Sequence, residues 1–275
     1  MSAATPTNGS DGSARRARFQ GKVVLVTGSS RGIGREIAAA FAAEGAHVVI
    51  TSCDAGEVHA VHRQFEEHGW SAMPCVADVR DAEAIARMVE AILARWSAID
   101  ILVNNAAIFP KRIPFLEIPF ENWREVIDVN LFGVVRVTQA VGRIMARQPE
   151  GGRIVNISSL NASRYRVTTI GQTQYNVAKA ALDNLTMGLA MELAPHGIIV
   201  NAIAPGFVDS TTLGKEDGQD DDPLRQDYLE GGRIPLRRYG QPRDCANLVL
   251  FLASPECTYM AGETVRIDGG LSFIF

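Results

Sequence analysis

Two kinds of hydrophobic pattern alternate along the chain from Gly21 onward. Short apolar runs rich in β-branched residues, such as KVVLVT at Lys22–Thr27, are separated by longer segments with helical periodicity. Apolar runs without polar alternation are typical of strands buried on both faces, as in a parallel sheet. The longer segments have the period of helices that bury one face. The pattern therefore predicts strands and helices in regular alternation.

Each predicted element can be assigned a range. The predicted strands are Lys22–Thr27, His47–Thr51, Ala72–Ala77, Asp100–Val103, Arg153–Ser158, Ile198–Ala204 and Glu263–Ile267. The predicted helices are Ile33–Glu44, Glu57–His68, Ala82–Trp96, Glu121–Gln148, Thr173–Leu193 and Asp244–Ala253. Alternation of this kind predicts an α/β fold, a Rossmann-like doubly wound parallel sheet with helices on both faces.

The domain organisation follows from composition along the chain. Nothing resembling a linker interrupts residues 21–275, so we predict a single domain there. Residues 1–20 are rich in Ser, Ala, Gly and Thr and lack the apolar core of a signal peptide, which predicts a disordered tail. Residues 207–233 are polar and irregular, with acidic side chains but no histidine; we predict a solvated loop that is long enough to act as a substrate lid.

Charge and cysteine content narrow the function classes. The net charge of −4 shows no basic excess, which argues against nucleic-acid binding. No stretch approaches the roughly 20 apolar residues that span a bilayer, so we expect no membrane partner. The four cysteines are scattered without Cys-x-x-Cys or zinc-like spacing, which predicts no metal site and reduced thiols in a cytoplasmic protein.

A glycine-rich turn follows the first predicted strand and opens the first predicted helix. Glycines in this context allow a tight turn and a close approach to a pyrophosphate, and the helix N-terminus supplies N–H donors. The turn therefore predicts a dinucleotide cradle. Its candidate cofactor contacts are Gly28, Ser30, Arg31, Gly32, Ile33 and Gly34.

Tyr175 and Lys179 form a candidate acid/base pair. Their spacing places them on one face of a helix, one turn apart. A phenol titrates near pH ~10, and a neighbouring ammonium group lowers its pKa. The alternative is an ordinary pair on a helix surface, and the residues around the pair distinguish the two.

The glycine turn and the Tyr-x-x-x-Lys motif together resemble the short-chain dehydrogenase/reductase family, including its 3-oxoacyl reductases. The resemblance covers the chain from Gly21 to about Phe275. Further family-like motifs fall in order along the chain. They are Asp78-Val79 after the third strand, Asn104-Asn105-Ala106-Ala107 with Ala107 in place of the family's glycine, Asn130 within Val129–Gly133, Ser159, and Pro205-Gly206 after the sixth strand.

The resemblance implies hydride transfer between nicotinamide and a ketone or secondary alcohol. It makes Tyr175 the proton donor, Ser159 a second donor to the same oxygen, and Lys179 the group that lowers the pKa of Tyr175. Asn130 would hold a water that connects Lys179 to solvent. Ser158 is the alternative to Ser159, and Asp78 could instead be a simple helix cap. The cofactor contacts implied outside the glycine turn are Ser52, Asp78, Val79, Asn105, Tyr175, Lys179, Pro205, Gly206 and Val208.

The residues that would read the adenosine ribose favour NADP(H). An acidic residue at the end of the second strand would repel a 2′-phosphate, and Ser52 stands at that position. Arg31 could pair with the phosphate. Cys53, where many NADP-using relatives have arginine, and the nearby Asp54 leave NAD(H) as the alternative.

The substrate and the assembly are less determined. The interval between Ser159 and Tyr175 is a few residues longer than the family usually carries, which predicts an unusual pocket wall. The candidates to face substrate are Asn161, Tyr165 and Gln172, and the apolar candidates, equally consistent with core or interface packing, are Phe109, Ile113, Phe115, Phe207 and Leu213. We interpret the scattered arginines as lying on solvated faces of the protein. The apolar end Leu271–Phe275 predicts a partner surface, consistent with a homodimer or homotetramer.

Two other functions compete with NADP(H)-dependent ketone reduction. One is an NAD-dependent alcohol dehydrogenase of the same family, and the other is a non-catalytic cofactor sensor on the same fold. The chain retains Asn130, Ser159, Tyr175 and Lys179, which favours the enzyme.

Overall fold

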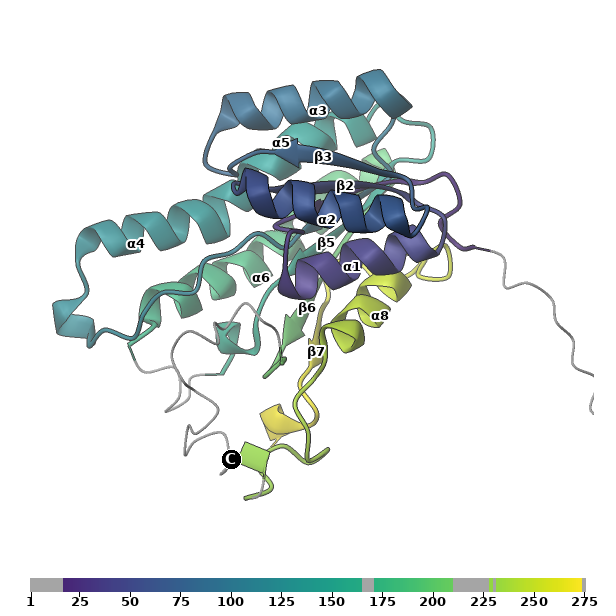
Figure 1. Cartoon of the computed structure of the whole chain (residues 1–275). Coiled ribbons are helices and arrows are strands. Elements are labelled where there is room, and N and C mark those ends of the chain that lie inside the picture. The colour runs from purple at the N-terminus through teal and green to yellow at the C-terminus, as the bar shows by residue number, and fades with distance from the viewer. Residues whose placement is uncertain (1–16, 165–170, 210–227, 230, 274–275) are drawn as a thin grey trace, which may run out of the picture.

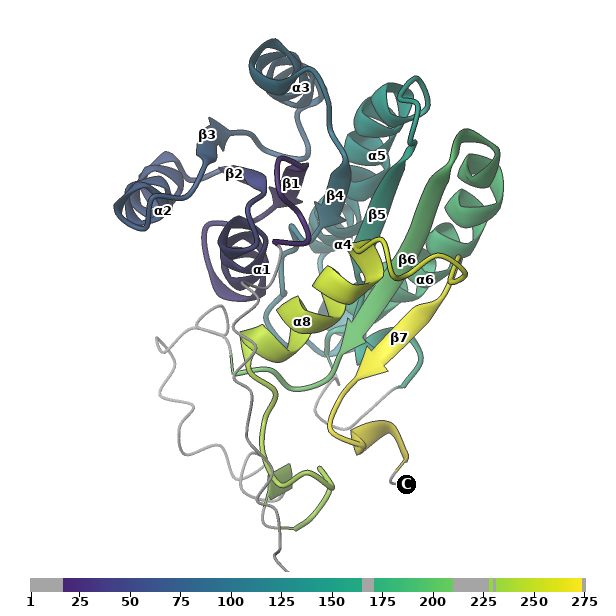
Figure 2. The same ribbon diagram turned by 90° about the vertical axis from the view of Figure 1, so that its right-hand side faces the viewer.

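The computed structural model describes residues 17–164, 171–209, 228–229 and 231–273. One parallel sheet has the strand order β3-β2-β1-β4-β5-β6-β7, as Figures 1 and 2 show. The strands are β1 (Val23–Thr27), β2 (His47–Ser52), β3 (Ala72–Val76), β4 (Ile101–Asn104), β5 (Gly152–Ile157), β6 (Ile198–Pro205) and β7 (Thr264–Ile267). The predicted doubly wound sheet is confirmed.

Helices cover both faces of this sheet (Figure 2). On one face lie α1 (Gly32–Ala43), α2 (Ala55–Glu67) and α8 (Pro242–Ala253), and on the other lie α3 (Ala82–Trp96), α5 (Gly133–Met145) and α6 (Thr173–Leu193). Strand β1 shows why its sequence lacks polar alternation. Val24 and Val26 pack into the core on the side of α1, α2 and α8, and Leu25 packs into the core on the side of α3, α5 and α6. Successive side chains of the strand are therefore buried on opposite faces of the sheet.

The strand order reverses between β1 and β4. The chain builds β1, β2 and β3 outward in one direction, and then returns to place β4 on the free side of β1. The two strands pair in register, with Val26 beside Val103, so Thr27 and Asn104 end them at the same edge. In open α/β sheets, ligands bind at the carboxyl ends of the strands beside such a reversal.

The predicted helix Glu121–Gln148 is wrong as a single element. The chain instead forms α4 (Phe120–Ile127), a π-helical turn labelled η2 (Asp128–Phe132), and then α5, which ends at Met145. A π turn inserts an extra residue into a helix and is frequent at functional sites. Asn130 is the middle residue of this turn and is fully buried, so the π turn directs a polar side chain into the interior of the protein.

The two segments predicted to lie outside the core are only partly described. Phe19 is 1% exposed and packs edge-on against Phe41 at 4.8 Å, so the folded part begins before Gly21. Within the predicted lid, Phe207 and Tyr228 are described and pack at 4.9 Å. The rest of the predicted tail and lid lies largely outside the described residues, together with Tyr165 and Leu213.

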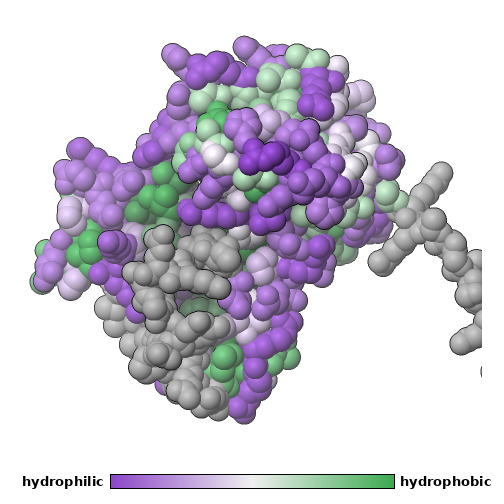
Figure 3. Space-filling model, viewed as in Figure 1, coloured by the Kyte–Doolittle hydropathy of each residue, from purple (hydrophilic) through white to green (hydrophobic). Residues whose placement is uncertain are grey.

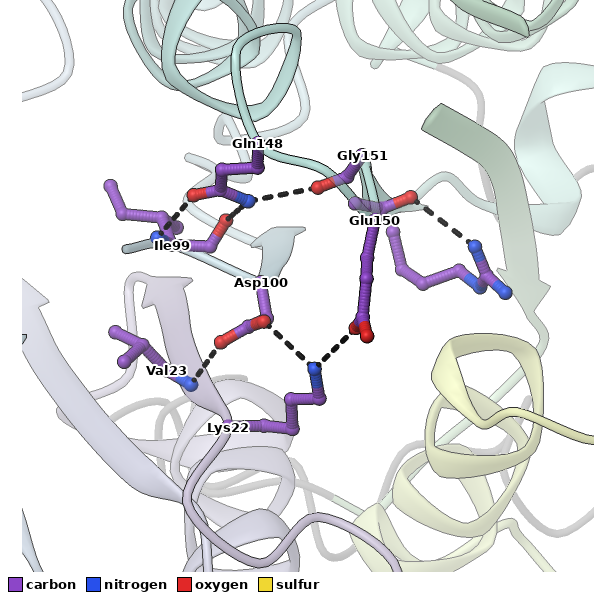
Figure 4. A network of polar contacts seen from close by, with 9 residues as sticks. Lys22, Val23, Ile99, Asp100, Gln148, Glu150 and Gly151 are labelled. Carbon is purple, nitrogen blue, oxygen red and sulfur yellow. Dashed lines mark hydrogen bonds and ion pairs between the residues drawn. The ribbon is translucent and has the colours of Figure 1, made fainter. Parts of the chain in front are cut away.

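A polar network ties together the amino ends of the central strands, at the opposite edge of the sheet from their carboxyl ends (Figure 4). Lys22 Nζ lies 3.1 Å from Asp100 Oδ1 and 3.0 Å from Glu150 Oε2. The second carboxylate oxygen of Asp100 accepts a hydrogen bond from the Val23 N–H at 2.8 Å. Because these residues precede or begin β1, β4 and β5, the network fixes the relative position of the strands at that edge.

Candidate active site

The glycine turn packs tightly against the segment that follows β4. Gly28 and Gly32 have φ angles of 63° and 56°, a region that favours glycine. A Cβ atom on Gly28 would lie 2.8 Å from Ala106 Cα, and one on Gly34 would collide with the Asn105 amide. The turn therefore needs glycine for close packing as well as for its backbone conformation.

Thr27 and Asn105 lock these two segments together. The Thr27 hydroxyl oxygen accepts hydrogen bonds from the Asn105 and Ala106 N–H groups at 2.9 and 3.0 Å. The Asn105 side chain donates to the carbonyls of Thr27 and Gly28 at 3.0 and 2.9 Å. The sequence did not mark Thr27 as a site residue, although a polar side chain at the end of a buried strand was the available signal.

The start of α1 suits an anion. Arg31 occupies the N-cap position without a side-chain cap, and the first turn contains no acidic residue. The first N–H groups of the helix, including that of Ile33, therefore receive no partner from a capping side chain. Combined with the close-packed glycine turn, this arrangement fits the pyrophosphate of a dinucleotide.

An unpredicted carboxylate contacts this turn. The Ser30 hydroxyl donates to Glu57 Oε2 at 2.6 Å, and an Arg31 guanidinium nitrogen lies 3.6 Å from Glu57 Oε1. Asp54, the acidic residue weighed from the sequence, instead caps α2 by accepting the Glu57 N–H at 2.9 Å. Ser52 accepts the Asp54 N–H at 3.1 Å.

Asp78 and Val79 follow β3 and lie close to the π turn. Asp78 accepts hydrogen bonds from the Arg80 side chain, the shortest at 2.6 Å, and these bonds lower the pKa of its carboxyl. The N-cap of α3 is Asp81, so Asp78 is not a simple helix cap. A Cβ atom on Gly133 would lie 2.6 Å from Val79 Cγ2, which places Val79 against the start of α5.

The Asn130 side chain pairs with the backbone of Ile108. Its Oδ1 accepts the Ile108 N–H at 2.8 Å, and its Nδ2 donates to the Ile108 carbonyl at 2.9 Å. Both polar ends of the amide are thus used within the protein. The π turn therefore anchors the segment after β4, and a water-holding role for this amide gains no support from its contacts.

Ser159 and Tyr175 are brought together. Their side chains share a hydrogen bond, and Ser159 Oγ also accepts the Asn161 N–H at 3.2 Å. Ser158 Oγ donates instead to the Lys179 carbonyl at 3.4 Å. Of the two candidate serines, Ser159 is therefore the one in contact with the tyrosine.

Lys179 is buried beside this pair. Its Nζ donates to the Ile157 carbonyl at 2.7 Å and lies 5.8 Å from the centroid of the Tyr175 ring. Burial lowers the pKa of Lys179 to about 8, against the opposing charge of Asp183. Burial also raises the pKa of Tyr175 to about 12, against the opposing hydrogen bond from Ser159. The expected lowering of the tyrosine pKa is wrong in this geometry because desolvation outweighs the other effects.

Polar contacts along α6 hold the face that carries Lys179 against the sheet. Burial raises the pKa of Asp183, one turn beyond Lys179, against the opposing influence of the neighbouring Ser158 and Thr264 hydroxyls. The buried Asn156 side chain of β5 donates to the Thr186 hydroxyl at 2.9 Å. Asp183 was missed in the sequence, although its spacing from Lys179 was a usable signal.

The first turn of α6 is tied to the segment after β4. Ile113 donates its N–H to the Gly171 carbonyl at 3.0 Å, and Gln172 Nε2 donates to the Pro110 carbonyl at 3.0 Å. Gln172 is 2% exposed, so its expected place facing the substrate is wrong. Phe109 is 47% exposed, and its ring lies 4.8 Å edge-on from Tyr175. Phe109 is therefore an apolar wall beside the tyrosine.

The remaining candidates lie around the end of β6. Pro205 ends the strand beside Ile267, and the Gly206 N–H donates to the Ile267 carbonyl at 2.9 Å. Val208 is buried and forms a parallel bridge with Gly240. Phe115 is not part of this group, because it packs against Trp123 at 6.5 Å. Across the described ranges, no group of three or more His, Cys, Asp or Glu residues could hold a metal ion, and no helix could cross a membrane.

Comparisons with known sequences find relatives over almost the whole chain. A family model described as enoyl-(acyl carrier protein) reductase matches residues 28–272. The 3-oxoacyl-[acyl-carrier-protein] reductase FabG of Aquifex aeolicus is 41% identical over 257 residues, which is 92% of this chain and 98% of that relative. A sorbitol dehydrogenase of Cereibacter sphaeroides is 38% identical over 258 residues, with 92% and 98% covered.

Solved structures show the same relationship. A gluconate 5-dehydrogenase from Burkholderia cenocepacia, in complex with NADP and tartrate, is 34% identical with a TM-score of 0.86, covering 94% of this chain and 98% of that chain. A 7α-hydroxysteroid dehydrogenase in complex with NADH is 32% identical with a TM-score of 0.85, covering 93% and 96%. With this fold, this constellation and these relatives, the chain belongs to the short-chain dehydrogenase/reductase family of oxidoreductases.

Proposed function

We propose that this chain transfers hydride between a nicotinamide cofactor and a ketone or secondary alcohol, with Tyr175 as the general acid and base. The observation that carries the proposal is the hydrogen bond between Ser159 and Tyr175 beside the buried Lys179. The bound cofactor would supply or accept the hydride. The protein would orient the two reactants and manage the proton.

The raised pKa of Tyr175 suits the reductive direction. With a pKa of about 12, the phenol is protonated at neutral pH and can donate to an oxygen that becomes an alkoxide. Ser159, already in contact with the hydroxyl, would offer a second hydrogen bond to the same oxygen. Lys179, with a pKa of about 8, carries a positive charge at neutral pH and would stabilise the phenolate that remains. Asn130 would be a positioning residue, because it fixes the backbone next to Phe109.

The cofactor would bind along the carboxyl ends of the strands. The glycine turn and the start of α1 would hold its phosphates, and Ser52, Asp78 and Val79 would lie on the adenosine side. Tyr175 and Lys179 would face the nicotinamide side together with Asn105, Pro205, Gly206 and Val208. The fit rests on the uncapped helix start and on glycines that no larger residue could replace.

We propose NADP(H) as the preferred cofactor and NAD(H) as the alternative. The guanidinium of Arg31 is 60% exposed next to the turn, where it can pair with a 2′-phosphate. No acidic residue ends β2, since Ser52 is its last residue. The solved relatives include a complex with NADP and another with NADH, so the family accommodates both.

The substrate proposal is a small carbonyl compound with an apolar substituent. The half-exposed Phe109 ring next to Tyr175 supplies an apolar wall on the side where a substrate oxygen would meet the tyrosine. The names of the relatives include acyl-chain ketone reduction and polyol oxidation at similar identity. An aryl or alkyl methyl ketone is therefore a suitable first substrate, and a polyol tests the rival direction.

We also propose that the chain assembles as a homodimer or homotetramer. Large apolar side chains are exposed on α4 (Phe120) and on α6 (Val177, Met187 and Met191). Figure 3 shows apolar patches over the projecting α4. Of the apolar chain end, Leu271 is buried within the domain and Phe273 is 74% exposed. A single monomeric mass by light scattering would count against this proposal.

The deciding experiment follows reduced nicotinamide by absorbance with a panel of ketones, and the reverse reaction with polyols and other secondary alcohols. Both NADPH and NADH are tested, and their dissociation constants are measured in parallel. Turnover with at least one carbonyl compound supports the enzyme. Tight nucleotide binding without turnover across the panel would instead favour a cofactor-binding sensor.

A further inference from the structure

The Glu57 carboxylate occupies the donors that surround the glycine turn. One of its oxygens accepts the Ser30 hydroxyl at 2.6 Å, and the other lies 3.6 Å from the Arg31 guanidinium. Ser30 is 8% exposed, so its hydroxyl has few alternatives to this partner. Glu57 belongs to the first turn of α2, which lies beside α1 on the same face of the sheet (Figure 2).

Backbone contacts hold Glu57 in this place. Asp54 caps α2 by accepting the Glu57 N–H at 2.9 Å, which fixes the direction of the first turn. The preceding strand is joined to the glycine turn, because Ser29 Oγ accepts the Thr51 N–H at 2.9 Å and the Ser29 N–H donates to the Thr51 carbonyl at 3.0 Å. The carboxylate is therefore presented to the turn by the ends of β1 and β2.

Phosphate monoesters and carboxylates compete for the same donors. A guanidinium and a hydroxyl would each bind the oxygens of a 2′-phosphate, and here both contact a carboxylate. A carboxylate beside an adenosine ribose accepts hydrogen bonds from a free 2′-hydroxyl and repels a phosphate. The Glu57 side chain therefore opposes binding of NADP(H) and is compatible with binding of NAD(H).

We infer that Glu57 is a cofactor-discriminating residue, whose carboxylate competes with the 2′-phosphate of NADP(H) for Ser30 and Arg31 and so narrows the preference for NADP(H) over NAD(H). This inference rests on the proposed function, because it requires that the turn binds a nicotinamide nucleotide. Binding of NADP(H) then requires Arg31 to leave Glu57, whereas binding of NAD(H) does not. The chain combines an arginine that attracts the phosphate with a glutamate that opposes it.

The test is a set of dissociation constants for NADPH and NADH, measured by calorimetry without any turnover substrate. Glu57→Gln keeps the size and the backbone N–H that Asp54 accepts, but it removes the charge. We expect its NADPH dissociation constant to fall roughly 10-fold and its NADH constant to stay the same or rise. Glu67→Gln, an exposed glutamate at the far end of the same helix, is the matched control and should change neither constant.

A double-variant cycle separates competition from a general charge effect. In an Arg31→Ala background, the gain in NADPH affinity from Glu57→Gln should shrink to less than roughly 3-fold, because the charged one of the two contested donors is gone and only Ser30 remains. An unchanged or weaker NADPH affinity in Glu57→Gln, with an intact thermal transition, would overturn the inference. A wild-type chain that binds neither nucleotide would instead overturn the proposed function, so the two failures are distinguishable.

Discussion

Ser159 and Tyr175 share a hydrogen bond across the gap between the end of β5 and the first turn of α6, while Ser158 turns toward the Lys179 carbonyl. Neighbouring residues at the end of a strand point to opposite sides. We therefore expect Ser159→Ala to lower the turnover number about 100- to 1,000-fold, as for loss of one oxyanion donor. Ser158→Ala is the matched control and should stay within about 5-fold of the wild type. Equal losses in both variants would contradict the assignment.

Replacement of Tyr175 by phenylalanine tests the acid itself. The ring and its contact with Phe109 are retained, whereas the proton and the bond to Ser159 are lost. We expect turnover to fall at least ~100-fold, with the NADPH dissociation constant within about 3-fold of the wild type. Steady-state kinetics and calorimetry measure the two effects separately. Near-normal turnover would falsify the role of Tyr175.

The pH dependence follows from the two buried groups. Burial lowers the pKa of Lys179 to about 8, so its positive charge is present below that pH and is lost as the pH rises through it. Burial raises the pKa of Tyr175 to about 12, so the phenol stays protonated over the same range. We expect the reductive turnover number, measured with saturating NADPH and ketone, to decline above about pH 8. A turnover number that stays flat to about pH 10 would show that the lysine charge is not needed.

The buried runs were sufficient to predict the sheet, because strands such as Val23–Thr27 are covered on both faces and their sequence shows it directly. The break in the helix after β4 could not be predicted in this way. The π turn contains Asn130, whose side chain pairs with the Ile108 backbone and so joins segments that are separate in the sequence. The predicted lowering of the Tyr175 pKa was wrong for a related reason, because the desolvation that raises it depends on three-dimensional packing.

Some residues of the candidate site could likewise be predicted from the sequence, and others could not. The motif residues Ser159, Tyr175 and Lys179 carry their own signal in type and spacing, and the structure brings them together. The contact between Glu57 and Ser30 joins the first turn of α2 to the glycine turn before α1, and both α1 and β2 lie between these two residues in the sequence. Nothing in the local sequence of α2 distinguishes Glu57 from an ordinary exposed helix residue, so only the packing of the elements reveals it.

Asn130 provides a stability prediction. Asn130→Ala removes both side-chain partners of the partly buried Ile108 backbone, leaving one N–H and one C=O unpaired. Each unsatisfied buried group costs ~1–3 kcal/mol, so we expect the free energy of unfolding to fall by about 2–4 kcal/mol in urea denaturation. Asn247→Ala, on the exposed face of α8, is the control and should change it by less than ~0.5 kcal/mol. Similar values for both variants would mean that the π turn does not depend on this pairing.

Replacement by alanine should have opposite effects at two glycines, Gly34 and Gly142. A Cβ atom on Gly34 collides with the Asn105 side chain, which holds the glycine turn, so we expect Gly34→Ala to weaken NADPH binding at least ~10-fold through a shifted turn. A Cβ atom on Gly142, within α5, meets no atom inside 4 Å. Gly142→Ala should therefore stabilise the protein by about 0.5–1 kcal/mol and leave the NADPH dissociation constant unchanged. Calorimetry and urea denaturation measure the two effects, and normal NADPH affinity in Gly34→Ala would show that the turn can yield without loss of the cradle.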